Sequence, residues 1–124
     1  MIDFNNGTFF KLRPDPKNSF FSVISPILVD GEQLMVAYKG VRDGVVFTDK
    51  RIIAINVQGM TGTKKDVTSL PYSKIQAFSV ESAGVLDNDC ELELWFSGMG
   101  KVKFEFVQSL NISGICKLIS NYVL

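Results

Sequence analysis

The sequence contains no histidine among its 124 residues. Imidazole is the most frequent general acid and base in enzymes and the commonest protein ligand of transition metals. Its absence excludes Ser-His-Asp and Cys-His catalysis and the HExxH zinc sites. We therefore expect no enzymatic activity, no cofactor and no metal.

Cysteine is scarce as well, because the chain has only Cys90 and Cys116. The two residues share no short metal-binding spacing, and both stand in apolar patterns. A domain of this length needs no disulfide to hold its core together. We expect two reduced thiols that pack as small apolar side chains.

A net charge and long apolar runs are also missing, since 13 basic residues balance 13 acidic ones. Nucleic-acid binders gain affinity from clustered Lys and Arg, so no nucleic-acid partner is expected. No apolar run reaches the roughly 20 residues that a membrane span requires, and the N-terminus lacks the pattern of a signal peptide. We expect a cytoplasmic protein.

Hydrophobic residues make up 46% of the chain, which is typical of a globular domain with a large core. We expect one domain over residues 1–124. Residues 1–18 predict an aromatic N-terminal arm, in which Pro14 and Pro16 stop any strand ladder. A short helix is predicted from Phe20 to Leu28, capped by Asn18 or Ser19 and limited by Pro26.

Strand-like segments and one helix account for the remaining chain, and the pattern is mainly β. The predicted strands cover 34–38, 43–48, a segment from 51 onward, 66–70, 75–81, 90–97 and 101–106. Residues 82–89 predict a loop. The predicted helix runs from Asn111 to Val123, with Ser109 or Asn111 as its cap.

The segment from 43 to 55 predicts a tight hairpin with a two-residue loop at Asp49 and Lys50. This loop length fixes the facing pairs, which are Thr48 with Arg51, Phe47 with Ile52, Val46 with Ile53 and Val45 with Ala54. One face then holds Val45, Phe47, Ile52 and Ala54, and the other holds Val46, Ile53 and Ile55. Both faces are apolar, so the second must be covered by the N-terminal arm, by the C-terminal helix or by another subunit.

The last two strands alternate between apolar and polar residues, as expected for a sheet with one buried face. The predicted inward residues are Cys90, Leu92, Leu94, Phe96, Val102, Phe104 and Phe106. A loop at Gly98, Met99 and Gly100 places Lys103 opposite Trp95. That pair predicts a cation–π contact of about 0.5–1 kcal/mol at an exposed site.

Several sequence blocks, in the same order along the chain, resemble the bacterial pleckstrin-homology-like (PH-like) domain family. The blocks are Val41-Arg42-Asp43-Gly44-Val45-Val46-Phe47-Thr48-Asp49-Lys50-Arg51-Ile52-Ile53, Gln58-Gly59, Gly62, Pro71-Tyr72-Ser73-Lys74-Ile75, Ala83-Gly84 and Glu91-Leu92-Glu93-Leu94-Trp95. The resemblance covers residues 30–123.

The resemblance implies a partly open antiparallel barrel of about seven strands in two nearly orthogonal sheets. A C-terminal α-helix would cap the barrel over residues 30–123, and the N-terminal arm and short helix would precede it. The resemblance also implies homo-oligomeric rings and no enzymatic activity. We therefore expect a non-enzymatic scaffold that self-associates and binds a protein partner of unknown identity.

Two interpretations remain open for the charged residues that flank the hairpin. They form either turns and local ion pairs, or the polar rim of an oligomer. The candidate surface for an oligomer or a partner comprises Arg42, Asp43, Val46, Asp49, Arg51, Ile53 and Ile55.

The alternative function is a lipid-binding or anion-binding module. Its candidate contacts are Lys39, Arg42, Lys64 and Lys65. The glycine-containing loop before Lys64 lacks the spacing of a P-loop, and Asp43 lies beside Arg42 and offsets its charge. Both features weigh against a membrane-lipid ligand, which stays the open alternative.

Residues 87–89 are interpreted as a turn, because they lack the spacing of a calcium loop.

Overall fold

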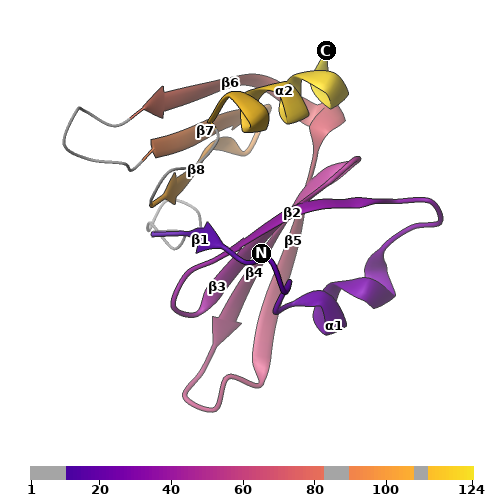
Figure 1. Ribbon diagram of the computed structural model, residues 1–124, viewed down its shortest axis with the longest axis vertical. Coiled ribbons are helices and arrows are strands. Elements are labelled where there is room, and N and C mark those ends of the chain that lie inside the picture. Colours follow the sequence, from indigo (N-terminus) through magenta and orange to yellow (C-terminus); the bar gives the residue numbers. More distant parts are fainter. Residues whose placement is uncertain (1–10, 83–89, 108–111) are drawn as a thin grey trace.

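Eight strands form two antiparallel sheets in the computed structural model, which describes residues 11–82, 90–107 and 112–124 (Figure 1). The first sheet has the order β1-β2-β3-β4-β5. Its strands are β1 (Arg13–Pro14), β2 (Leu34–Lys39), β3 (Asp43–Thr48), β4 (Arg51–Gln58) and β5 (Lys64–Pro71). The second sheet contains β6 (Ile75–Ser82), β7 (Cys90–Phe96) and β8 (Gly100–Phe106).

The helices lie on opposite sides of the five-stranded sheet (Figure 1). Helix α1 (Phe21–Ile24) continues into a single 3₁₀ turn, η2 (Ser25–Ile27), as expected from the limiting position of Pro26. A second 3₁₀ turn, η3 (Tyr72–Lys74), leads from the first sheet to the second. Helix α2 (Ile112–Val123) contributes Ile115 and Ile119 to the core between the sheets.

The predicted fold class is confirmed, because the chain is mostly strand, in two sheets that do not close, with a C-terminal helix. The hairpin register is also confirmed, since Val45 faces Ala54, Val46 faces Ile53 and Phe47 faces Ile52. The predicted helix caps at residues 109 and 111, the loop at 83–89 and the first ten residues of the arm lie outside the described residues.

The β3–β4 hairpin is buried on both faces. Its first face belongs to the main core, together with the inward residues of β7 and β8. Its second face forms a separate cluster in which Val46, Ile53 and Ile55 are at most 1% exposed. Burying a Val or Ile side chain stabilises the fold by about 1.5–3 kcal/mol, so this cluster is a large part of the stability.

The covering element on the second face is the segment around α1, which supplies Phe20, Ile24 and Leu28. The aromatic ring of Phe20 fills the space that a side chain at Gly44 would need, so a glycine lets the segment approach the sheet closely. The cover is therefore the short helical segment at residues 20–28, which was not among the three coverings expected from the sequence.

Residues 12–14 join the two sheets. The backbone N–H of Leu12 donates to Glu105 O at 3.0 Å, and Val107 N–H donates to Leu12 O at 2.9 Å. The next residues, Arg13 and Pro14, pair with β2 in the other sheet. Leu12 is fully buried, so this seam contributes both hydrogen bonds and apolar contacts to the barrel.

The predicted cap of the short helix is wrong. No side chain at Asn18 or Ser19 caps α1; instead the Asp15 carboxylate accepts hydrogen bonds from Ser19 N–H at 2.7 Å and Ser19 Oγ at 3.1 Å. The prediction that the prolines stop the ladder is confirmed, because β1 ends at Pro14, which faces Tyr38. Pro14 is tolerated because an edge position needs no further N–H donor.

The predicted register of the last hairpin is wrong as well. Its loop is 97–99, because Phe96 pairs with Gly100, and Trp95 therefore faces Lys101 instead of Lys103. Gly98 and Gly100 have φ values of 81° and 91°, which shifts the turn by one residue. Lys103 forms an ion pair with Glu91 at 3.2 Å. The inward residues of both strands are buried as predicted.

Candidate functional site

The edge of β2 is largely open. Strand β1 pairs only with Tyr38 and Lys39, and Asp15 N–H adds one hydrogen bond to Ala37 O at 2.9 Å. In the part of the chain that the structure describes, no strand lies beside residues 34–36 on this side. An open edge displays backbone N–H and C=O groups that pair readily with another strand.

The sequence after β1 explains why the edge stays open. Pro14 and Pro16 have no N–H to donate, so the ladder cannot continue past Asp15. Asn18 adopts a φ of 49°, and its N–H donates to Asp15 O at 3.0 Å. This turn directs the chain away from the sheet and into α1, leaving residues 34–36 uncovered.

Two hollows flank the open edge, one on each face of the sheet. The first has a volume of about 370 Å³ and lies on the α1 face, where it is lined by Pro14, Asp15, Pro16, Asn18, Leu34, Met35, Val36, Ala37 and Val46. The second has a volume of about 290 Å³ and lies between β2 and α2, where it is lined by Met35, Val36, Tyr38, Gly114, Ile115 and Leu118. Met35 and Val36 line both, so the edge is a crest between them.

The side chains of β2 are divided between the two faces. Leu34 and Ala37 pack in the α1 cluster, whereas Val36 and Tyr38 pack in the main core. The pairing with β3 shifts between Leu34 and Val36, which makes Met35 the extra residue of a bulge. Met35 is 46% exposed, and such bulges are frequent beside binding sites.

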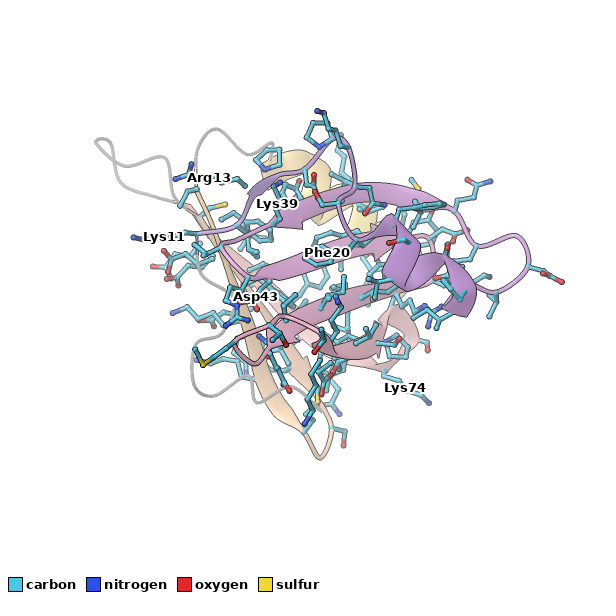
Figure 2. All side chains as sticks on the ribbon, turned by 90° about the horizontal axis from the view of Figure 1, so that it is seen from below. Lys11, Arg13, Phe20, Lys39, Asp43 and Lys74 are labelled. Atoms are coloured by element: carbon cyan, nitrogen blue, oxygen red, sulfur yellow. The ribbon has the colours of Figure 1, made fainter. Side chains whose placement is uncertain are left out.

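Cations gather at the β1 end of the open edge. Arg13 and Lys39 face each other across the two strands, and both are exposed. Figure 2 shows them at the same end of the molecule as Lys11. Like charges in facing positions repel each other. The arrangement therefore favours an anionic group at this rim.

Asn18, one of the residues around the first hollow, has a buried acceptor atom. The Oδ1 atom of Asn18 is inaccessible to solvent and has no hydrogen-bond partner among the described residues. An unsatisfied buried acceptor weakens a fold by about 1–3 kcal/mol.

The predicted contact surface on the hairpin is not an external surface. Val46, Ile53 and Ile55 are covered within the chain by the segment around α1, which corrects the expectation that a partner would cover them. The covering is local because residues 20–28 carry the complementary apolar side chains. The charged residues of the same surface are also engaged within the chain.

Arg51 fastens the connection before β2 to the hairpin. Its Nε and Nη2 donate to the two carboxylate oxygens of Glu32, each at 2.9 Å. Its remaining donors reach Ile27 O at 2.7 Å and Ser69 Oγ at 2.9 Å. Arg51 thus links segments of its own chain, which supports the interpretation of this residue as part of a local ion pair and not of an oligomer rim.

Glu32 lies at the centre of this network, with a fully buried side chain. It also accepts hydrogen bonds from Thr48 Oγ1 at 2.7 Å and Val29 N–H at 3.1 Å. Burial alone would raise the pKa of Glu32, but the hydrogen bonds from Arg51, Thr48 and Val29 outweigh it and lower the pKa to about 2. The carboxylate is therefore ionised at neutral pH and structural in role.

The two acidic candidates are also engaged within the chain. Asp49 accepts a hydrogen bond from Gln33 N–H at 2.9 Å, and its own N–H donates to Gln33 O at 3.0 Å. Asp43 accepts one from Asn56 Nδ2 at 2.5 Å. Burial raises the pKa of Asp43, and the Asn56 hydrogen bond and the Arg42 charge oppose that effect.

The candidate anion contacts lie near one end of the first sheet, where the β2–β3 and β4–β5 connections meet. The Arg42 guanidinium donates to Gly59 O and links the two connections. Lys39 Nζ donates to Ser19 Oγ at 3.3 Å, and Lys65 Nζ donates to Gly62 O at 3.1 Å. Lys64 is exposed at the start of β5. Three of the four thus point at oxygens of the chain itself.

Neither cysteine forms a disulfide in the described chain; Cys90 is buried and Cys116 is half-buried. Within residues 11–82, 90–107 and 112–124, no three metal-ligating side chains cluster together. Over the same residues, no helix has the length and apolar character to cross a membrane.

The open edge of β2 was not predicted as a site. The strand itself was predicted, but the strand order that leaves one side uncovered depends on residues far apart in the sequence. The alternation of Pro14, Asp15 and Pro16 next to a short pairing segment is the one local signal that could have indicated it.

Comparison with known proteins gives a consistent result. The family model described as the bacterial PH domain matches residues 3–123. The uncharacterized protein YjqA of Bacillus subtilis is 43% identical over 99 residues, covering 78% of this chain and 79% of YjqA. The uncharacterized protein YozO of the same organism is 30% identical over 100 residues, covering 81% of this chain and 86% of YozO.

Solved structures agree with the fold. A protein with a pleckstrin-homology domain from Shewanella loihica is 40% identical, with a TM-score of 0.80 over 93% of this chain and 99% of that one. A pleckstrin homology domain from Shewanella amazonensis is 44% identical, with a TM-score of 0.66 over 89% and 90% of the two chains.

Proposed function

The chain belongs to the bacterial PH domain family, and from that premise we propose that it is a non-enzymatic interaction module that binds a protein partner in the cytoplasm. The proposed contact is the open edge of β2, together with the hollows on its two faces. The family and its fold support an interaction module in general, and the open edge supports this particular surface.

The observation that carries the proposal is the uncovered stretch at residues 34–36. Backbone groups at a sheet edge are satisfied either by water or by the backbone of another chain. The apolar hollows beside the stretch add side-chain contacts, which water cannot provide. A protein partner satisfies both requirements at once.

Self-association, expected from the family resemblance, remains part of the proposal. The second face of the hairpin cannot be the contact between subunits, because α1 and its flanking residues cover it. Light scattering on the full chain at micromolar concentration measures the assembly state. A monomer would remove self-association from the proposed function.

The interaction itself is tested with two variants of the full chain. Met35→Lys places a charge on the open edge, and Met60→Lys makes the same change at a fully exposed methionine in the β4–β5 connection. Proteins captured from a lysate of the native organism are identified, and hydrogen exchange maps the contact of each purified partner. We expect protection at residues 34–37 and loss of capture with Met35→Lys only. Protection elsewhere would contradict the proposal.

A further inference from the structure

The shape of the open edge restricts what can bind there. Residues 34–37 form a crest, with a hollow on the α1 face and another on the α2 face. Successive side chains of a β-strand point to opposite faces of a sheet, and neighbouring strands lie about 4.8 Å apart. A strand added beside β2 would therefore send its side chains alternately into the two hollows.

A helix could not satisfy this edge. Its backbone N–H and C=O groups are already paired with each other, so it has none to offer to β2. Extended peptides bind sheet edges through main-chain hydrogen bonds, and pockets for alternate side chains give them specificity. Both hollows are lined mainly by apolar side chains, such as Leu34 and Val46 in one and Ile115 and Leu118 in the other.

The rim charges add a second requirement. Arg13 and Lys39 are exposed and face each other where β1 pairs with β2, beyond the open stretch, and neither forms an ion pair with a described residue. The Asp15 carboxylate in the first hollow is buried, and both of its oxygens accept hydrogen bonds from Ser19. An acidic ligand group is therefore favoured at the rim and an apolar group inside the hollow.

We propose that the β2 edge binds an extended peptide segment of a partner protein, with apolar side chains at alternate positions and an acidic residue at the end next to Arg13 and Lys39. This inference rests on the proposed function and specifies the class of partner. The peptide would form one more strand of the first sheet, in line with β1.

The test begins with a phage-displayed library of random ten-residue peptides selected against the full-length protein. Selected peptides are synthesised, and their affinities are measured by fluorescence anisotropy. We expect alternating apolar residues with an acidic residue near one end, and amide shifts at residues 34–37. Peptides with apolar residues at helical spacing would overturn the inference, as would a failure to select any peptide.

Backbone methylation tests strand pairing directly. Only alternate N–H groups of an added strand face β2, so N-methylation at one set of positions should weaken binding at least about tenfold, whereas methylation at the other set should change it less than about threefold. Equal effects at both sets would overturn the inference. If binding still mapped to residues 34–37, the proposed function would stand without it.

Charge reversal supplies the matched control. Lys39→Glu should weaken the acidic peptide up to about fivefold, as expected for an exposed ion pair. Lys74→Glu, at the distant position that Figure 2 labels, should leave the affinity unchanged. Equal effects of the two substitutions, or a second copy of the chain found on the edge by crosslinking, would overturn the inference.

Discussion

Arg51 and Glu32 form a two-pronged ion pair in which both N–O distances are 2.9 Å. The two residues are 19 positions apart, and the pair attaches the connection before β2 to the β3–β4 hairpin. It therefore holds α1 and its flanking residues over the second apolar face. The ion pair between Arg51 and Glu32 is therefore part of the fold and not of a binding surface.

Loss of this pair is expected to destabilise the protein strongly. Glu32→Gln leaves the Arg51 guanidinium without its carboxylate, and removing one partner of a buried ion pair lowers the free energy of unfolding by about 3–5 kcal/mol. Glu81→Gln, at an exposed position, is the matched control and should have little effect. Urea unfolding of both variants measures the difference. Equal stability of the two variants would contradict the structural role.

The stability is also expected to depend on acid. The pKa of Glu32 is about 2 in the folded protein, below its ordinary value of 4.5. The contribution of Glu32 is therefore complete above about pH 4.5 and is lost as the pH falls toward 2. The difference in unfolding free energy between the wild type and Glu32→Gln should shrink over this range. A difference that stays constant from pH 6 to about pH 2 would refute the assignment.

Gly44 and Phe20 should act as a coupled pair. A Cβ at position 44 would occupy the space of the Phe20 ring, so Gly44→Ala should lower the unfolding free energy by about 1–3 kcal/mol through overpacking. In a Phe20→Ala background the same substitution should be nearly neutral. A double-mutant cycle from thermal unfolding measures the coupling. Additive effects would show that the ring does not lie there.

The buried phenol of Tyr72 predicts a stabilising substitution. Its ring stacks on Tyr122 with centroids 5.7 Å apart, but its hydroxyl has no hydrogen-bond partner among the described residues. Burial raises the pKa of Tyr72, as do the nearby Tyr122 and Asp49. Tyr72→Phe should raise the unfolding free energy by about 1 kcal/mol, because it removes an unsatisfied group. Tyr122→Phe, at a 40% exposed residue, is the neutral control.

Anionic membranes should not bind the protein measurably. The chain has no net charge, and Arg42 and Lys65 donate hydrogen bonds to its own oxygens. Sedimentation with phosphatidylserine vesicles at low and high salt tests this expectation. Salt-sensitive binding that Lys64→Glu and Lys65→Glu abolish would instead support the anion-binding alternative.

The sequence was sufficient for features governed by short-range rules. The two-residue loop at Asp49 and Lys50 fixed the hairpin register, and alternation assigned Val46 and Ile53 to a second buried face. The sequence did not predict the hydrogen-bond partners of side chains where tertiary packing determines those partners. Asp15 replaces the expected cap at Ser19, and Arg51 reaches Glu32 across the hairpin, because tertiary packing brings these pairs together.

The seam at residues 12–14 bears on any shortened version of this protein. Leu12 bonds to the second sheet and Arg13 pairs with the first, so a chain that began after Leu12 would lose the hydrogen bonds that join the two sheets here. A deletion that removes Leu12 should therefore weaken the contact between the two sheets. Such a chain would be a poor choice for judging what the intact molecule can bind.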